Sequence, residues 1–244
     1  MLDPSLSLDQ KGLYGLIAAI TMENQPVTMA DLARRAGCGR TTLRRYLAEL
    51  ITYGYVIVGK SGPDQRYHTV VLTEEASDRS DALIKGIVRR LSLARKRIRE
   101  EHSKESVGEA LMKEWLTLLI AESMFTDNAR PGFMINPLTG ERLEYDRRYP
   151  ALKLAWEFHG PHHFQHADPT VLAKQQANDM VKIGRSQREG ITLIEVKASD
   201  LRLDRMVALI PPSVPRRSLE GLGEVVTFLE AESAHYRREP RGHR

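Results

Sequence analysis

The sequence has very few of the residues and patterns that mark several common protein classes. Its single cysteine, Cys38, excludes an internal disulfide and any cysteine-clustered zinc site. It has no run of about 18 apolar residues, so we expect no membrane partner. The opening MLDPSLSLDQ lacks the charged-then-apolar layout of a signal peptide, which favours a cytoplasmic protein. It also lacks a glycine-rich phosphate loop, and nothing supports a nucleoside triphosphatase.

The composition is that of a globular protein with an uneven charge. A chain of 244 residues suits one large or two small domains, and a hydrophobic content of 41% is enough to bury a core. The net charge is only +4, but residues 85–99 hold seven Lys or Arg and no acid. Such a run is typical either of polyanion binding or of a solvated helix face.

Two capping patterns mark the first helices. Ser7 followed by Gln10 predicts a helix over roughly residues 8–22, and apolar residues at helical spacing support it. Thr28 and Asp31 predict a second, short helix, MADLARRAG, which ends at a glycine.

A third helix, RTTLRRYLAELITYG, follows a Gly-Cys-Gly turn. Leu43, Leu47 and Leu50 share one face and should point inward. Two helices joined by a tight turn match the helix-turn-helix arrangement, in which the later helix enters the major groove. Arg can bind guanine or phosphate, and Thr and Tyr suit base edges or the backbone. The predicted DNA-binding residues of this helix are Arg40, Thr41, Thr42, Arg44, Arg45 and Tyr46.

A predicted β-hairpin comes next, because YVIVGK and RYHTVVL alternate like strands around the turn SGPDQ. With this hairpin, residues 8–72 resemble the winged helix-turn-helix family, and ADLARRAGCGRTTLRRYLAELITYGYV carries the match. The resemblance implies DNA binding, with Lys60 and Arg66 near the tip of the wing. Gly39 stands where the family often has a capping Ser or Thr. The alternative is a winged helix used only for protein contacts.

A connecting segment separates this region from the rest of the chain. Residues 73–79 are polar and acidic and suggest a linker. Apolar residues from Ser80 to about Glu101 recur at helical spacing beside the basic run, which predicts a helix. This helix could join two domains, form a homodimer or lie along DNA, and the sequence does not choose among these roles.

The stretch LEYDRRYPALKLAWEFHGPHHF has the pattern of a hairpin that holds two carboxylates together. Residues Leu143–Asp146 and Leu152–Phe158 read as strands around a turn at Tyr149-Pro150-Ala151, which places Asp146 opposite Glu157. Opposed residues have Cβ atoms about 5 Å apart. Carboxylates that close repel each other, which favours a divalent cation between them over a solvated surface pair. A Mg²⁺ ion there could polarise a phosphodiester.

The segments around this hairpin add further polar groups. In SVGEALMKEWLTLLI, Glu109 shares a helix face with apolar residues, so it either is buried beside a cation or is a helix-end Glu favoured by the dipole. A later helix should begin at Asp168-Pro169 and end before Gly190. Asp179 and Lys182 lie on one face of it. The strand ITLIEVK and two closing helices follow.

These segments together resemble a known nuclease family. SVGEALMKEWL, LEYDRRYPALKLAWEFHGPHHF and NDMVKIGRSQREGITLIEV are similar to the nuclease domain of very-short-patch-repair-type endonucleases, in the PD-(D/E)XK restriction-endonuclease-like superfamily. The resemblance covers roughly residues 103–200, and E-x-x-G-P-x-H-F is its strongest piece. It implies an α/β domain with a mixed central sheet and phosphodiester hydrolysis assisted by Mg²⁺ or Mn²⁺.

The same resemblance assigns roles to individual residues. Asp146 and Glu157 would bind the metal, and Glu109 would be a helix carboxylate near it. His163 would transfer a proton or contact phosphate. Asp179 and Lys182 match the acidic-then-basic pair on the following helix, where Lys182 could offset phosphate charge.

The sequence departs from the superfamily at one position. His159 stands two residues after Glu157, where the superfamily usually has the lysine of E-x-K and the relatives most similar to this chain have the aspartate of E-x-D. His159 shares the face of Glu157 but supplies no permanent cation at neutral pH, so an altered or lost activity is one expectation.

Two other sites compete with this assignment. Glu195-Val196-Lys197 is a literal E-x-K on a strand, sixteen residues after Asp179, but the helix between them leaves no hairpin to bring the carboxylates together. Four histidines invite a zinc site, although no cysteine is near and the spacings fit no standard finger. They are His159, His162, His163 and His166.

The sequence as a whole predicts an α+β or α/β protein with an N-terminal winged helix, a connecting helix and a restriction-endonuclease-like domain. The predicted ranges are 1–72, 73–102 and 103–236, followed by a disordered basic tail at 237–244. The first functional hypothesis is a DNA-binding, metal-dependent endonuclease in defence, repair or mobile-element biology. The second is a transcriptional regulator whose nuclease-like domain serves for binding or dimerisation.

Overall fold

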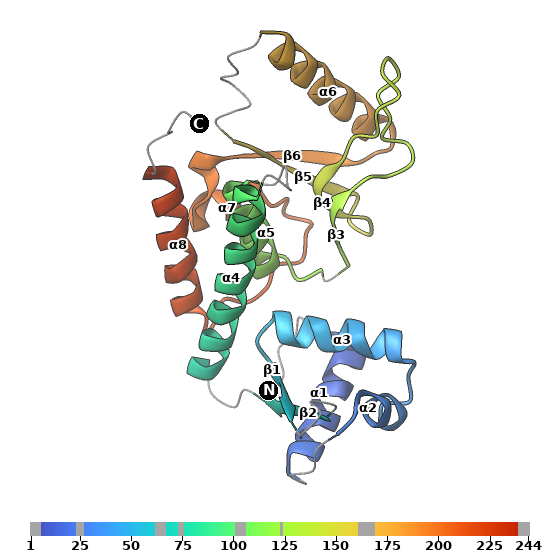
Figure 1. The fold of residues 1–244 in the computed structure, drawn as a ribbon, viewed down its shortest axis with the longest axis vertical. Coiled ribbons are helices and arrows are strands. Elements are labelled where there is room, and N and C mark those ends of the chain that lie inside the picture. Colours follow the sequence, from blue (N-terminus) through green and yellow to red (C-terminus); the bar gives the residue numbers. More distant parts are fainter. Residues whose placement is uncertain are drawn as a thin grey trace. The chain divides into compact units, whose positions relative to one another are not determined.

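The computed structural model describes residues 6–22, 27–61, 67–72, 76–100, 106–122, 124–160 and 169–238. The chain divides into two compact units, one formed by Met1–Arg89 with Arg217–Val226 and the other by Arg90–Arg216 with Thr227–Arg244. Figure 1 shows their helices and strands, coloured along the sequence. This division passes through the connecting helix, so the domain ranges drawn from the sequence stay predictions.

The first unit contains three helices followed by a two-stranded hairpin. Its elements are α1 (Leu8–Met22), α2 (Met29–Arg35), α3 (Arg40–Thr52), β1 (Val56–Ser61) and β2 (Tyr67–Leu72). The three inward-facing leucines predicted for α3 are buried in one core with Ile17 of α1 and Leu32 of α2. β1 and β2 pair antiparallel, with Val56 opposite Leu72 and Ser61 opposite Tyr67. The order of helices and strands predicted for this region is confirmed.

Both predicted helix caps are present. The backbone N–H of Ser7 donates to Gln10 Oε1 at 2.7 Å, and that of Gln10 donates to Ser7 Oγ at 3.2 Å. At the start of α2, Thr28 Oγ1 accepts from the backbone N–H of Asp31 at 3.1 Å. Gly37, at the turn into α3, has a positive φ of 64°, which glycine adopts without steric cost.

The connecting helix α4 (Ala76–Arg99) begins earlier than the sequence indicated. Residues 76–79 were expected to be linker, and they form its first turn. Arg79 explains the extension, since its Nε donates to the carbonyl of Tyr53 at 3.1 Å and its guanidinium lies 4.1 Å from the ring centroid of Tyr55. These contacts with the first unit stabilise a turn that local sequence alone does not favour.

The second unit is built around a four-stranded mixed sheet in the order β3-β4-β5-β6. Its elements are α5 (Val107–Leu119), β3 (Thr126–Ala129), β4 (Tyr145–Tyr149), β5 (Leu154–His159), α6 (Pro169–Arg188), β6 (Thr192–Lys197), a short 3₁₀ turn (Ala198–Asp200), α7 (Leu203–Leu209) and α8 (Gly223–Arg238). The first three strands pair antiparallel, and β6 joins parallel to β5 through α6. Figure 1 shows α6 on one side of the sheet and α5 and α7 on the other.

The central hairpin of this sheet turns later than expected. The predicted turn at Tyr149-Pro150-Ala151 is shifted, since Tyr149 is the last residue of β4 and residues 150–153 form the turn. Pro150 has no N–H to continue the ladder, and Lys153 takes a positive φ of 50° before β5 begins. The turn thus loses Tyr149 and gains two residues before β5, and in the observed register Asp146 falls opposite Glu157.

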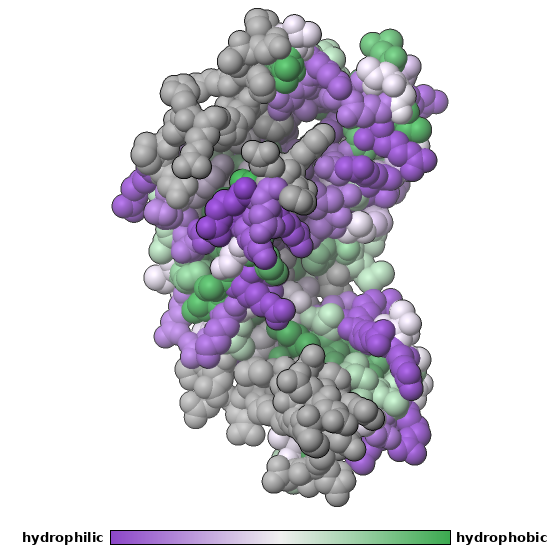
Figure 2. Space-filling view, in the orientation of Figure 1, coloured by the Kyte–Doolittle hydropathy of each residue, from purple (hydrophilic) through white to green (hydrophobic). Residues whose placement is uncertain are grey.

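The core of the second unit includes the two tryptophans, Trp115 and Trp156, both fully buried as expected of core residues. Trp115 also donates its indole N–H to Ser233 Oγ of α8 at 3.0 Å. Hydrophilic residues cover much of the described surface on the face drawn in Figure 2. Within the described ranges, no helix is long and apolar enough to cross a membrane.

Candidate active site and DNA-binding helix

Asp146 of β4 and Glu157 of β5 lie next to each other, as the hairpin pattern predicted. Arg147 pairs with Trp156 in the antiparallel register, and one further step brings Asp146 opposite Glu157. Asp146 Oδ2 accepts the backbone N–H of Phe158 at 2.6 Å, which fixes the aspartate against β5. Glu157 is only 4% exposed. The sheet therefore holds two carboxylates together in a largely dry environment.

Burial and mutual repulsion disfavour the charged forms of this pair. Burial is the main cause that raises the pKa of Glu157 to about 8, and the neighbouring Asp146 carboxylate adds to it. The pKa of Asp146 is also raised by burial, against the N–H of Phe158 and the ammonium groups of Lys182 and Lys113, which lower it. A divalent cation beside the pair would offset both the burial of the carboxylates and their mutual repulsion.

Lys182 supplies part of that positive charge from α6. Its Nζ donates to Glu157 Oε2 at 2.8 Å, and both side chains are largely buried. Burial works to lower the pKa of Lys182, but Glu157, Asp146 and Asp179 together raise it. The predicted acidic and basic positions on α6 therefore act on the carboxylate pair. Glu157 Oε1, in contrast, is buried with no hydrogen-bond partner among the described residues.

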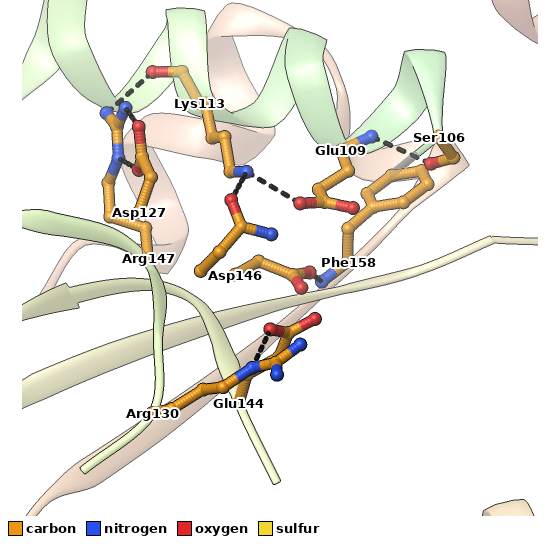
Figure 3. Close-up of polar contacts among 10 residues, drawn as sticks. Ser106, Glu109, Lys113, Asp127, Arg130, Glu144, Asp146, Arg147 and Phe158 are labelled. Carbon is orange, nitrogen blue, oxygen red and sulfur yellow. Dashed lines mark hydrogen bonds and ion pairs between the residues drawn. The ribbon is translucent and has the colours of Figure 1, made fainter. Parts of the chain in front are cut away.

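Glu109 is buried near the first turn of α5, and Lys113 one turn later is its cation. Lys113 Nζ donates to Glu109 Oε1 at 2.6 Å and to Asn128 Oδ1 of β3 at 2.9 Å (Figure 3). Ser106 caps the helix by accepting the N–H of Glu109 at 3.0 Å. Glu109 thus satisfies both expectations, a buried acid with a cation and an acid in the first turn of a helix.

Sequence analysis missed Lys113 as a site residue. The signal was present in GEALMK, because Glu109 and Lys113 stand four residues apart on a predicted helix and so share a face. Lys113 was overlooked because a lysine among apolar residues resembles an exposed position. In the structure it is 6% exposed and close enough to Asp146 to lower the pKa of that carboxyl.

Arg147 joins α5 to β3 behind the carboxylates. Its guanidinium donates to both oxygens of Asp127, at 2.6 and 3.0 Å, and to the carbonyl of Lys113 at 2.8 Å. It also reaches Thr117 Oγ1 at 2.7 Å. Figure 3 shows Arg147 and Asp127 beside Lys113. Since it binds the backbone of Lys113, Arg147 fixes α5 in the position from which Lys113 and Glu109 approach Asp146.

The alternative E-x-K on β6 lies closer to the site than the sequence suggested. The helix α6 was expected to leave its carboxylate apart from the others, but parallel pairing across α6 places Glu195 beside Glu157 and Lys197 beside His159. The side chains differ in burial, since Glu195 is 41% exposed and lies 3.8 Å from His159 Nδ1. Glu157 remains the buried acid, and Lys197 lies beside His159.

The carboxylate pair has the donor chemistry of a Mg²⁺ or Mn²⁺ site. Such ions take oxygen ligands, and Mg²⁺ usually retains several waters beside one or two carboxylates. The unpartnered Glu157 Oε1 beside Asp146 fits that requirement. Among the described residues no three His, Cys, Asp or Glu side chains gather as a metal cluster. The predicted His163, and the histidines proposed for zinc at 162 and 166, lie outside the described residues.

The helix α3 presents most of its predicted DNA-binding residues outward. Arg40, Thr41, Arg44 and Arg45 are exposed, and Thr42 is half-buried. Tyr46 is held within the unit, because its hydroxyl donates to Asp9 Oδ2 of α1 at 2.7 Å. The guanidinium of Arg45 lies 4.8 Å from the ring centroid of Tyr46. Lys60 lies on β1, and its side chain and all of Arg66 are outside the described residues.

Comparison with known proteins identifies the first unit. Residues 14–57, which span most of α1 through the start of β1, match the IclR helix-turn-helix domain. The N-terminal part of the chain is therefore a helix-turn-helix DNA-binding domain of the IclR type.

Comparison with curated proteins adds one viral relative. The chain is 37% identical over 82 residues to "Uncharacterized protein 033L" of Invertebrate iridescent virus 3, which covers 30% of this chain and 42% of the viral protein. The chain thus spans less than half the length of that relative. No solved structure matches the chain.

Proposed function

We propose that this protein is a DNA-binding endonuclease that hydrolyses phosphodiester bonds with Mg²⁺ or Mn²⁺, and that its sheet unit is of the PD-(D/E)XK type. The observation that carries the proposal is the buried, unpartnered Oε1 of Glu157 beside the Asp146 carboxylate. Burying a carboxylate oxygen without a hydrogen-bond donor costs free energy unless a cation binds that oxygen. The opposed strands place Asp146 and Glu157 side by side, which supports this assignment.

Each residue of the site then has a defined role. Asp146 and Glu157 would hold the divalent ion, which when bound polarises the phosphodiester and acidifies an attacking water. The N–H of Phe158 orients Asp146, and Lys182 orients Glu157 through its second oxygen. Both carboxylates are thereby held before the substrate arrives, so little reorganisation is needed during the reaction.

Lys113 and Lys182 together compensate for His159, which stands where the superfamily has a lysine. Lys113 is on α5 and Lys182 is on α6, and these helices lie on opposite sides of the sheet. Each ammonium group lowers the pKa of Asp146. The negative charge that develops on the phosphoryl oxygens would be offset from these two positions. Glu109 accepts a hydrogen bond from Lys113 and so orients that side chain.

The N-terminal unit would bring this site to DNA as a winged helix. In this proposal α3 enters the major groove with Arg40, Thr41 and Arg44, and the β1–β2 hairpin acts as the wing. The exposed arginines of α3 and the IclR-type match to residues 14–57 support the DNA-binding part.

Plasmid cleavage tests the proposal. Purified protein should nick or cut supercoiled DNA in the presence of Mg²⁺ or Mn²⁺ and should lose this activity with EDTA. Asp146→Ala and Glu157→Ala should each reduce cleavage by at least about 100-fold, because each removes a ligand. Glu195→Ala, beside Glu157 on β6, is the matched control and should retain activity. Cleavage that survives in the Asp146 and Glu157 variants would sink the assignment.

A regulator that binds DNA without cutting it is the second candidate. The ion pairs Lys182–Glu157 and Lys113–Glu109 balance part of the buried charge without any metal, and this observation favours it. In that case the sheet unit would serve as a binding or dimerisation module. Tight DNA binding with no cleavage under any divalent ion would identify this function.

A further inference from the structure

A basic pocket lies in the sheet unit among the ends of three helices. It has a volume of about 330 Å³ and is formed by residues of α4, α5 and α8. Two arginines, a histidine and a tyrosine provide its polar groups, while an isoleucine and a valine provide its apolar wall. The lining residues are Arg95, Ile98, Arg99, Val107, His235 and Tyr236.

The charge of this pocket is positive and only partly balanced. Arg95 donates to Glu232 Oε2 at 2.7 Å, which offsets one guanidinium. Arg99 is exposed and pairs with no acid within the described part of the chain. Guanidinium groups match phosphate oxygens in a bidentate geometry, and an apolar wall suits the sugar attached to a phosphate.

The pocket is linked to the carboxylate site through Phe158. The ring centroids of Tyr236, which lines the pocket, and Phe158 lie 6.2 Å apart. The backbone N–H of the same Phe158 binds Asp146. Gly108, one residue after the pocket residue Val107, approaches both rings so closely that an added Cβ would lie 2.2 Å from Phe158. The pocket residue Tyr236 and the site residue Asp146 therefore both contact Phe158, near the end of β5.

We propose that this pocket binds a backbone phosphate of a nucleic-acid strand, next to the phosphodiester that the carboxylate site would cut. This inference rests on the proposed function for its choice of ligand, and it adds a subsite with named residues. Arg99 makes the main contact, and Arg95 adds a second one that Glu232 weakens. Phosphate contacts of this kind fix the register of a strand without reading its sequence.

Binding of a labelled single-stranded thymidine pentanucleotide tests the proposal without any cleavage. Full-length protein carrying Asp146→Asn is used in EDTA at about 50 mM salt, and affinity is measured by fluorescence anisotropy. Arg99→Gln should weaken binding about 5- to 10-fold and reduce the slope of log affinity against log salt by about 0.7, the value for one single-strand phosphate contact. Glu232→Gln should tighten binding, because it leaves Arg95 unpaired.

Two residues at the end of α4 and just beyond it provide matched controls, Lys96 for the basic Arg99 and Glu100 for the acidic Glu232. Lys96 and Glu100 form an exposed pair at 3.7 Å and do not line the pocket. Lys96→Gln and Glu100→Gln should each change the affinity less than twofold. Equal effects of Arg99→Gln and Lys96→Gln would overturn the proposal, since a diffuse field rather than the pocket would then bind the strand.

The source of the phosphate is tested in the same assay. Thymidine monophosphate and inorganic phosphate are added as competitors, and both should displace the pentanucleotide only at far higher concentration than unlabelled pentanucleotide does. Displacement by the mononucleotide at an equal concentration would overturn the proposal in favour of a free-nucleotide site. Failure of the nuclease proposal would appear separately, as absent plasmid cleavage by the wild type with pentanucleotide binding intact.

Discussion

Glu157 determines the electrostatics of the candidate site. Its carboxyl is buried between a like charge on β4 and a lysine on α6, and one oxygen has no donor among the described residues. Ionising Glu157 is therefore costly, and a bound cation would interact with the carboxylate oxygen that has no donor. Such perturbed acids concentrate at functional sites, which is why the pair supports a chemical role.

The raised pKa of Glu157 predicts how stability depends on pH without metal. Its pKa rises from 4.5 to about 8 on folding, so between these values the folded state binds more protons than the unfolded state. The free energy of unfolding in EDTA should therefore fall as pH rises from about 5 to about 8. The raised pKa of Asp146 acts in the same direction. Urea denaturation at several pH values measures the effect.

Glu157→Gln supplies the comparison for that pH series. Glutamine stays neutral, so the decline in stability should be much smaller and the variant should exceed the wild type at pH 8. Glu195→Gln, the exposed neighbour on β6, should follow the wild-type curve. Parallel curves for wild type and Glu157→Gln would show that Glu157 is not the titrating group.

Lys113 should prove essential to the stability of the sheet unit. Lys113→Met removes the ammonium partner of buried Glu109 and leaves Asn128 without its donor, so we expect a loss of about 3–5 kcal/mol in the free energy of unfolding. Adding Glu109→Gln should recover a large part of this loss, because the carboxylate that lost its ammonium partner is then replaced by a neutral group. A single variant as stable as the wild type would contradict the ion pair.

At the scale of elements, α5 and β5 approach each other closely at Gly108. A Cβ there would lie 2.2 Å from the ring of Phe158 and 2.7 Å from the hydroxyl of Tyr236. Since the next residue of α5 is Glu109, and Phe158 follows Glu157, this contact sets the position of both acids. The helix and strand must keep this contact for the site to retain its geometry.

Gly108→Ala should therefore destabilise the protein by about 1–3 kcal/mol, because the new methyl group displaces Phe158. Gly184 offers a matched control in α6, where an added Cβ meets nothing within 4 Å. Gly184→Ala should stabilise by about 0.5–1 kcal/mol, as alanine does within an exposed helix. Thermal or urea unfolding distinguishes them, and equal effects of the two substitutions would contradict the close approach.

The helix α3 should carry the DNA affinity of the first unit. If Arg44 contacts a base, Arg44→Ala should cost about 1–3 kcal/mol in the free energy of binding to duplex DNA and should relax the sequence preference. If Arg44 contacts a phosphate, the same substitution should weaken binding to all sequences uniformly. Lys11→Ala, on α1, should change affinity by much less. An electrophoretic mobility shift series at fixed salt makes the comparison, and unchanged affinity in Arg44→Ala would remove α3 from the interface.

Local sequence patterns predicted most elements, because their signals lie within a few residues of each other. The capping pair Ser7 and Gln10, and the alternation that placed Asp146 opposite Glu157, are of this kind. Arg79 was missed because its position depends on tertiary partners, Tyr53 and Tyr55, which lie at a distance along the chain. Lys113 was missed although its pairing with Glu109 is local, because its burial and its contact with Asn128 depend on how α5 packs in the folded unit.

At the scale of the whole molecule, a DNA-binding unit and a candidate catalytic unit share one chain with a net charge of +4. A helix-turn-helix domain can deliver the second unit to DNA without any change in its chemistry. Variants in α3 and variants of the carboxylate pair should therefore affect different properties, DNA affinity for the first and metal use for the second. The parallel pairing of β6 with β5, which brought Glu195 beside Glu157, was not predicted, because strand order depends on how the whole chain folds.

The central claim is that Asp146 and Glu157 form a divalent-cation site, and calorimetric titration of Mn²⁺ into the full-length protein tests it most directly. We expect one ion to bind per chain, with proton release and with an affinity that rises from pH 6 to pH 8, because Glu157 must lose its proton. Binding should disappear in Asp146→Asn and Glu157→Gln and persist in Glu195→Gln. Undiminished binding in the first two variants, or none in the wild type at pH 8, would contradict the claim.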